Sequence, residues 1–368
     1  VGEDSLRVAG DPFHEESQID RAQRQLETAA GDAGDVDDVV YHLAHPLRAD
    51  LQAVDHGQNI IVPVPIANLL FEQKEVTIYE AADRPGGLAA GFKLPHWDWS
   101  VEWYYHHWFA SDKHMLELID ELGWREDVQF PTPVTVMYHK GKFYPFDSIK
   151  NALLYPGLGW GINKIRFGLV GVYLRLTNSW RKLEQTTTDA WMRKYAGNKV
   201  YEEMWLPMME GKFGQRWAEK VSMAWMWARL HARTTKLGTF TGGFQAFADR
   251  FARKLQELGV QIRYQEAVES INPGPESGVV LLTEKGESQV FDQVLVTLSP
   301  GKLAAMAPVL PKEYLESLLS LKSMGAVVMT LTLDRQLSRE GYYWYSIPKQ
   351  AGYPFLALVE HTNFLKPE

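Results

Sequence analysis

The chain has 368 residues, of which 38 are basic and 46 acidic, with a formal net charge of −8 and no cysteine. The lack of cysteine excludes disulfides, thiolate metal sites and a cysteine nucleophile, and the acidic balance argues against a nucleic-acid-binding protein. With 45% hydrophobic residues the composition is that of a globular protein; no apolar run is long enough to span a membrane, and no secretion signal is visible, so we expect a cytoplasmic protein.

Charge and tryptophan divide the chain into two unlike parts. Residues 1–73 hold 14 acidic and 4 basic residues, a net charge of −10, which leaves 34 basic against 32 acidic residues in 74–368. Twelve of the 13 tryptophans lie between Trp97 and Trp227. Residues 1–58 are therefore an acidic N-terminal segment of no assigned fold. Its helices, expected over 15–30 and 37–51, lack an apolar stripe, and its histidines (His42, His45 and His56) lack the spacing of a metal site, so no metal is expected.

The next part, residues 59–110, begins with a β-like run at 59–62 that prolines interrupt, and a short helix is expected over 66–73. Residues 76–80 form the clearest predicted strand, because they are β-branched or apolar and end in the acid Glu80. A turn-rich loop containing Arg84, Gly86 and Gly87 follows this strand.

Residues 111–235 are predicted to be mainly helical. A helix is expected over 115–122, a β-hairpin over 130–144 with its turn at Lys140-Gly141, and helices over most of 149–235. The stretch 221–227 is apolar nearly all round and is expected to be buried. Trp and Met at helical spacing favour packing over the alternative, a wide apolar pocket.

One helical stretch, residues 164–181, is apolar with basic flanks. It could touch a membrane surface, which would make the protein peripheral to a membrane. A buried helix with arginine caps is the favoured interpretation.

Residues 236–368 return to mixed α/β structure. A helix is predicted over 244–258 and a strand over 260–264, followed by hairpin strands over 279–282 and 290–291. Further strands are expected over 293–298, which should be buried, and over 326–333 and 342–347. The whole pattern is α/β with a helical, aromatic-rich insertion.

The strand that ends at Glu80 carries the sharpest chemical signal. A carboxylate at the end of the second strand of a nucleotide-binding unit accepts hydrogen bonds from ribose hydroxyls. The loop after it offers Arg84 and the bare backbone of Gly86 and Gly87, which can approach a pyrophosphate closely. An ordinary glycine-containing turn is the equally weighted alternative.

These four residues resemble the second-strand motif of the FAD-dependent amine oxidase, protoporphyrinogen oxidase and phytoene desaturase superfamily. Residues 241–247, 267–271 and 292–300 resemble segments that carry the chain through the flavin domain of that superfamily. Residues 102–109 and 211–214 are similar to its bacterial protoporphyrinogen-oxidase-like branch. The resemblance covers about residues 75–360 and is specific to the superfamily rather than to one substrate.

The resemblance implies a discontinuous Rossmann-like FAD-binding domain, from 59–110 and 236–300, with a substrate domain of mixed sheet and helices. The helical part would be 111–235, and 301–368 would supply truncated substrate-domain strands. FAD would be held by Glu80 at the ribose, by Arg84, Gly86 and Gly87 at the pyrophosphate, and by Val268 at the adenine. A small apolar substrate would be oxidised by hydride transfer to the flavin, and nucleic acid is not an expected partner.

The chain departs from the superfamily in several places. A Gly-x-Gly-x-x-Gly turn is expected before Leu70, but residues 62–67 read Val-Pro-Val-Pro-Ile-Ala. The last flavin-contacting segment is not found before residue 368. Met329 falls at or near the position where amine oxidases place a lysine, which lowers the amine-oxidase interpretation. Two alternatives therefore stand: a flavin-dependent isomerase of the nucleotide-sugar mutase kind, and a non-catalytic fragment unable to bind FAD.

His106 and His107 are the candidate catalytic residues. The resemblance places them near the reactive face of the flavin, where one could assist proton transfer at neutral pH. A structural histidine in an aromatic loop is the favoured alternative for both.

Overall fold

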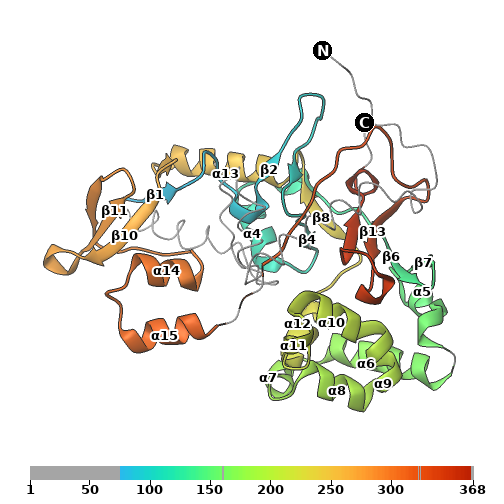
Figure 1. Ribbon diagram of the computed structural model, residues 1–368. Coiled ribbons are helices and arrows are strands. Elements are labelled where there is room, and N and C mark those ends of the chain that lie inside the picture. Colours follow the sequence, from blue (N-terminus) through green and yellow to red (C-terminus); the bar gives the residue numbers. More distant parts are fainter. Residues whose placement is uncertain (1–74, 160, 322, 324, 366–368) are drawn as a thin grey trace. The chain divides into compact units, whose positions relative to one another are not determined.

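A computed structural model describes residues 75–159, 161–321, 323 and 325–365 (Figure 1). The elements expected over 15–30, 37–51, 59–62 and 66–73, and the proline-containing stretch 62–67, lie outside the described residues. The chain divides into a unit of residues 1–53 with 325–327 and a unit of residues 54–324 with 328–368. All helices and strands described below belong to the second unit.

Strand β1 (Thr77–Glu80) pairs in parallel with β9 (Gln261–Tyr264), so that residues 184 places apart in the sequence lie side by side (Figure 1). Helix α13 (Phe244–Glu257) ends just before β9 and packs its Leu255 against apolar side chains of both strands. A short connection between a helix and a parallel strand is typical of a βαβ arrangement. The predictions of a strand over 76–80, a helix over 244–258 and a strand over 260–264 are confirmed.

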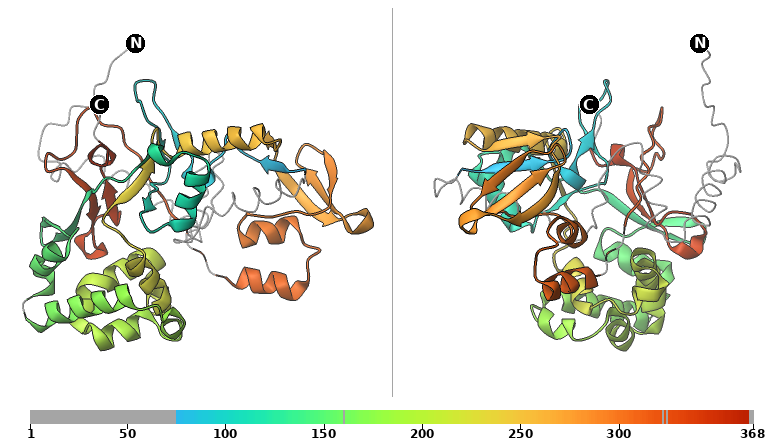
Figure 2. Two further views of the ribbon diagram at one scale, coloured as in Figure 1. Left: turned by 180° about the vertical axis from the view of Figure 1, so that it is seen from behind. Right: turned by 60° about the vertical axis from the view of Figure 1, so that its left-hand side comes forward.

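Strands β10 (Val268–Pro273), β11 (Val279–Thr283) and β12 (Ser288–Phe291) form an antiparallel sheet, and α14 (Pro300–Met306) packs against β10 and α15 (Lys312–Ser320) (Figure 2). The predicted hairpin is confirmed. The predicted buried strand over 293–298 is wrong: the stretch is irregular and its Leu295 is 63% exposed. Val294 and Val296 nevertheless pack inward beside Ile271. The alternation of apolar residues in the sequence therefore reflects one packed side of an irregular segment.

A second sheet has the strand order β14-β13-β6-β7, formed by β6 (Val134–His139), β7 (Lys142–Pro145), β13 (Tyr342–Ser346) and β14 (Ala357–Val359). The turn between β6 and β7 places Lys140 at φ 49° and Gly141 at φ 83°, the left-handed pair that a tight hairpin favours. The predicted hairpin and the strand over 342–347 are confirmed.

The predicted strand over 326–333 is wrong. The structure leaves this stretch irregular, with Met329 71% and Leu331 66% exposed. Alternation of apolar residues is only half of a strand signal, because a strand also needs a neighbour to complete its hydrogen bonds. Met329 therefore does not stand on a strand.

The helical part contains α5 (Ile149–Leu154), α6 (Ile162–Leu176), α7 (Trp180–Glu184), α8 (Thr188–Tyr195), α9 (Asn198–Val200), a π-helical turn (Tyr201–Trp205), α10 (Leu206–Phe213), α11 (Gln215–Ala218) and α12 (Met223–His231). Its core is built from fully buried methionines together with Leu174, Val200 and Tyr201. The helical prediction for 149–235 is confirmed.

Two burial predictions for this part need correction. In 221–227 the side chains of Met223 and Met226 are buried, but those of Trp225 and Trp227 are only partly so. In α6 the favoured buried helix is wrong, because only Val170 and Leu174 of this helix are buried. A 15-residue helix that contacts a core along one narrow side leaves the rest of its surface open.

The remaining short strands surround the start of α13. Strands β2 (Gly91–Phe92) and β3 (Val101–Glu102) pair with each other, and β8 (Leu237–Phe240) pairs with both β4 (Trp108–Phe109) and β5 (Val128–Gln129). Helix α4 (Lys113–Glu121), predicted over 115–122 and confirmed, packs there in a cluster of aromatic and aliphatic residues: Trp108, Ile119, Trp124, Phe240, Phe244 and Phe247.

Candidate functional site

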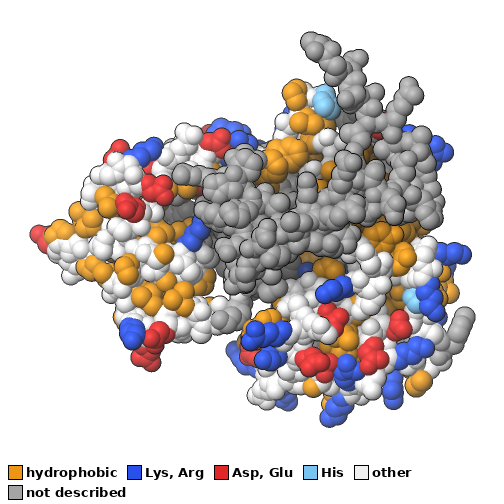
Figure 3. All heavy atoms as spheres, in the orientation of Figure 1, with side chains coloured by type: hydrophobic (Ala, Val, Ile, Leu, Met, Phe, Trp, Pro, Cys, Tyr) orange, Lys and Arg blue, Asp and Glu red, His pale blue; other side chains and the backbone are white. Residues whose placement is uncertain are grey.

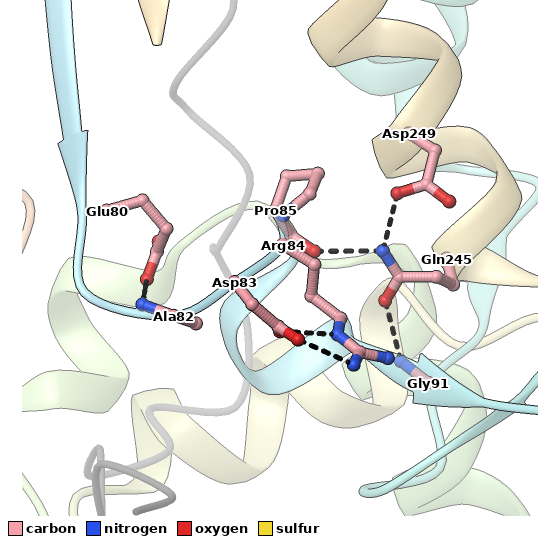
Figure 4. Close-up of polar contacts among 8 residues, drawn as sticks. All are labelled: Glu80, Ala82, Asp83, Arg84, Pro85, Gly91, Gln245 and Asp249. Carbon is pink, nitrogen blue, oxygen red and sulfur yellow. Dashed lines mark hydrogen bonds and ion pairs between the residues drawn. The ribbon is translucent and has the colours of Figure 1, made fainter. Parts of the chain in front are cut away.

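The loop that follows β1 is tied to the segment that follows β9. Oε1 of Glu80 accepts a hydrogen bond from the backbone N–H of Ala82 at 2.8 Å (Figure 4). The backbone N–H of Glu266 donates to the Glu80 carbonyl at 3.1 Å, and that of Gln265 donates to the Ala82 carbonyl at 2.9 Å. The carboxylate of Glu80 is thus held at the carboxyl end of two parallel strands, the edge where open α/β sheets bind ligands.

Arg84 makes an ion pair with its neighbour in the sequence, Asp83. Its Nε lies 2.8 Å from Oδ1 and its Nη2 3.1 Å from Oδ2, and both side chains are about half exposed (Figure 4). The hydrogen bond from Arg84 lowers the pKa of Asp83, and the same bond raises the pKa of Arg84. Exposed pairs of this kind contribute little stability, so Arg84 can exchange its partner for a more strongly charged anion.

Gly86 and Gly87 form the turn of this loop, with φ angles of 123° and 52°. A Cβ added at Gly86 would lie 3.0 Å from Cα of Ala90, whereas one at Gly87 would meet no atom of the described residues within 4 Å. Gly86 is therefore required both by its backbone angle and by the close approach of Ala90. Gly87 leaves its backbone open toward its surroundings, as a pyrophosphate-binding turn needs.

Gln245, on the first turn of α13, fastens this loop to the helix (Figure 4). Its Nε2 donates to the carbonyl of Pro85 at 3.0 Å and to Oδ1 of Asp249 at 2.8 Å, and its Oε1 accepts from the N–H of Gly91 at 3.0 Å. The side chain is only 9% exposed. Our sequence reasoning missed this residue. The available signal was a glutamine on the buried face of an amphipathic helix, where a polar group needs partners.

Glu102 and Gly243 fix the N-terminus of the same helix. Oε1 of Glu102 accepts from the N–H of Phe244 at 2.9 Å, and the side chain is 5% exposed. Burial raises the pKa of Glu102, opposed by that hydrogen bond. A Cβ on Gly243, which has φ 89°, would lie 2.4 Å from Oγ of Ser100. The backbone of Gly243 therefore packs directly against Ser100, the residue before β3.

Val268 begins β10 opposite Thr283, and the ladder register shifts between Val268 and Ser270. The Val268 side chain packs beside Ile271 and Leu281. Val268 follows two residues after Glu266, whose N–H is bonded to Glu80. Val268 therefore follows closely in the chain on a residue that is bonded to Glu80.

His106 and His107 lie in the aromatic loop between β3 and β4. Nδ1 of His106 contacts the carbonyl oxygen of Tyr104, which can only accept, so Nδ1 carries the proton. Burial lowers the pKa of His106, which favours the neutral ring, and the ring lies 5.9 Å from that of Phe244 at the start of α13. The His107 ring packs edge-on against Phe109 at 5.0 Å.

Two basic side chains that sequence reasoning did not single out, Lys212 and Arg229, interact electrostatically with each other, and Arg229 also interacts with Tyr105. Burial lowers the pKa of Lys212, on α10, to about 8, and the charge of Arg229 on α12 contributes. Burial also lowers the pKa of Arg229 and raises that of Tyr105, and the two side chains interact electrostatically. Within the described residues no carboxylate forms an ion pair with Lys212 or Arg229. This position therefore favours an anion.

The profile of flavin-containing amine oxidoreductases matches residues 66–357. Among solved structures, the chain resembles a putative protoporphyrinogen oxidase from Exiguobacterium sp. 255-15, with 17% identity, 79% of this chain and 68% of that chain covered, and a TM-score of 0.52. It also resembles cyclohexylamine oxidase from Brevibacterium oxydans IH-35A, with 16% identity, coverage of 69% and 60%, and a TM-score of 0.51.

A third similar structure is the CLA-producing fatty acid isomerase from P. acnes, with 14% identity, coverage of 77% and 67%, and a TM-score of 0.54. At these identities the similarity shows the fold alone. The chain spans 60% to 68% of the length of these structures. No curated protein matches the sequence.

Proposed function

Because the chain belongs to the family of flavin-containing amine oxidoreductases, we propose that this FAD-dependent oxidoreductase oxidises a small apolar substrate by hydride transfer to the flavin. The observation that carries the proposal is the fastening of the Glu80–Gly91 loop to α13 by Gln245. This contact holds a carboxylate and a glycine turn together at the end of parallel strands. Such a constellation fits the ribose and pyrophosphate of a dinucleotide.

Different described residues are assigned to different groups of FAD. In the proposal, Glu80 accepts from ribose hydroxyls, Arg84 with the backbone of Gly86 and Gly87 meets the pyrophosphate, and the backbone at Val268 meets the adenine. When bound, FAD supplies the acceptor for a hydride. The parallel pair β1–β9 under α13 supports a Rossmann-like unit, built from 59–110 and 236–300.

The proposal assigns substrate binding to the remaining parts of the chain, residues 111–235 and 301–368. The sheet that joins β6 and β7 to β13 and β14 unites residues 134–145 with 342–359. This pairing supports a substrate domain in which strands from 301–368 join the part that contains residues 111–235.

An apolar substrate with one anionic group fits the surroundings of Tyr105. The Tyr105 ring packs edge-on against Trp344 at 4.7 Å, which gives an apolar wall, while Lys212 and Arg229 provide positive charge without an acidic partner among the described residues. His106 is the proposed proton acceptor. Its Nδ1–H donates to the carbonyl of Tyr104, so Nε2 is the ring nitrogen whose lone pair accepts a proton in the proposal.

Flavin binding by paired variants tests the cofactor assignment. Glu80→Gln keeps an acceptor for the Ala82 N–H but removes the charge that the ribose hydroxyls meet, so affinity for FAD, measured by quenching of flavin fluorescence, should fall about tenfold or more. Glu75→Gln, an exposed residue just before β1, is the matched control and should bind as the wild type. Equal affinity of Glu80→Gln and wild type, or no flavin binding by the wild type, would overturn the assignment.

Reduction of the bound flavin tests the reaction. Anaerobic mixing with substrate should bleach the flavin, and oxygen should restore its absorbance. Turnover with no net reduction would instead favour the isomerase alternative.

A comparison of apolar carboxylates with their methyl esters tests the anionic group. The wild type should prefer the acids, and Lys212→Gln should lose that preference through KM. Lys220→Gln, an exposed lysine of the same helical part, should keep it.

A further inference from the structure

Helix α6 exposes a continuous apolar stripe. Residues at spacings of three and four along a helix share one face, and the exposed apolar side chains of α6 follow this spacing. They are Ile162, Ile165, Leu169, Val172, Tyr173 and Leu176, with exposures from 48% to 74%. Val170 and Leu174, on another side of the helix, are buried in the helical core. The helix thus has a packed side and a separate apolar side that faces solvent.

Basic residues border this stripe, and acidic residues are absent from its surroundings in the sequence. From Ser148 to Leu183 the chain has no Asp or Glu but has Lys150, Lys164, Arg166, Arg175, Arg181 and Lys182. On the helix, Arg166 borders one side of the stripe, and Lys164 and Arg175 border the other. An apolar stripe between rows of cations is the pattern of a helix that lies in a lipid interface.

Neighbouring elements extend this surface. Helix α5 contacts α6 and exposes Leu153 and Leu154. Tyr173 stacks on Trp191 of α8 at 5.8 Å, and Trp191 lies 4.6 Å from Tyr195. Tyr and Trp rings are favoured at the level of lipid headgroups, because each ring has an apolar body and a polar tip.

Exposed apolar residues alone would not point to lipid. Figure 3 shows hydrophobic side chains also exposed on the part that carries β10–β12, α14 and α15, among them Leu319 and Leu321. That part has acidic neighbours on the same helix: Lys312 of α15 pairs with Glu316 at 3.6 Å, and Glu313 lies in the first turn. Charge therefore distinguishes the two helices: the charged residues of α6 are all basic and complement anionic headgroups, whereas α15 also carries acidic residues.

We propose that the α6 stripe docks on a membrane surface that carries anionic lipids, with Leu169 and Leu176 inserted among the acyl chains and the bordering cations at the headgroups. No helix of the described residues is long and apolar enough to cross a bilayer, so α6 lies in the plane of the surface. The proposal does not depend on flavin binding. It also gives an apolar substrate a direct source, the lipid phase.

Sedimentation of the full chain with vesicles tests the proposal. The chain should bind vesicles of phosphatidylcholine mixed with phosphatidylglycerol, bind pure phosphatidylcholine vesicles far more weakly, and be released by high salt. Leu169→Glu/Leu176→Glu should reduce binding at least tenfold, since it places charges where acyl chains would lie. Both positions are mostly exposed, at 65% and 74%, so folding, checked by circular dichroism, should be unchanged.

Matched variants separate the α6 surface from a general effect of added charge. Leu319→Glu/Leu321→Glu, at positions 55% and 64% exposed, should bind vesicles as the wild type does. Arg166→Gln/Arg181→Gln should weaken binding to the anionic vesicles only. The proposal is overturned if the wild type binds neither kind of vesicle, or if the two double glutamate variants bind equally. It is also overturned if gel filtration shows a wild-type dimer that does not bind vesicles and that Leu169→Glu/Leu176→Glu converts to a monomer.

Discussion

The surroundings of the α13 N-terminus and the helical core of residues 149–235 are held together by different forces. Around α13, buried polar groups form specific hydrogen bonds. Gln245 bonds to the loop after β1, and Glu102 accepts from the backbone N–H of Phe244. In the helical part, methionines, aliphatic residues and tyrosines fill most of the core by apolar contact, with one buried hydroxyl, that of Thr188, donating to the carbonyl of Ser222. Hydrogen bonds fix direction and distance, whereas apolar packing fixes mainly volume. The first region should therefore be intolerant of small chemical changes that the second accepts.

Gly243→Ala should produce the largest loss in the α13 region. The new methyl group would lie 2.4 Å from Oγ of Ser100 at a left-handed backbone angle, so the free energy of unfolding should fall by about 4 kcal/mol from overpacking and backbone strain together. Urea denaturation measures this. The control Gly286→Ala has a similar φ of 82°, but its new methyl group would meet no atom of the described part of the chain within 4 Å, and the change should cost about 1–2 kcal/mol. Equal losses would show that the close contact is not limiting.

Gln245→Leu should have the next largest effect. It preserves approximate side-chain size but leaves the N–H of Gly91 and the carbonyl of Pro85 without their partner, at about 3 kcal/mol of unfolding free energy. Gln256→Leu, at an exposed position of the same helix, should change stability by less than about 0.5 kcal/mol. Similar results for the two variants would remove the distinction drawn between the regions.

Glu102→Gln should have a smaller effect that depends on pH. Burial raises the folded-state pKa of Glu102 above its ordinary 4.5, so its contribution to stability is fully present below 4.5 and is lost as pH rises through the folded value. Gln stays neutral and keeps an acceptor for the Phe244 N–H. The stability of the variant relative to wild type should therefore increase as pH rises above 4.5. A difference that is flat with pH would contradict this.

Met192→Leu, in the helical core, should have the smallest effect. Met192 is fully buried, but a swap that conserves volume should cost less than about 1 kcal/mol. Met192→Ala, which leaves a cavity, should cost about 2–5 kcal/mol. If Met192→Leu were as damaging as Gln245→Leu, the helical core would be as exacting as the polar region, and the comparison would fail.

Local patterns predicted many elements correctly because their signals lie within a few residues. The hairpin at Lys140-Gly141 and helix α13 with its glycines before and after it are examples. The predictions of strands over 293–298 and 326–333 were wrong because an alternating apolar pattern does not show whether another strand lies alongside. The motif at Glu80 was recognisable from residue types and spacing, but which group each side chain contacts was not.

The contacts that complete the site join residues distant in the sequence. Gln245 lies 154 residues from Gly91 and 160 from Pro85, and no local pattern connects them. The pairing of Arg84 with Asp83 is the reverse case, a contact between adjacent residues.

The sequence by itself determined the family, the position of the proposed nucleotide-binding motif and the origin of the net charge. The −8 of the chain comes from residues 1–73, since residues 74–368 carry a net +2. Only the tertiary structure decided which polar groups meet around α13 and which side of α6 faces solvent. The physical reason is that composition and spacing act along the chain, whereas burial and hydrogen-bond partners depend on segments that meet only after folding.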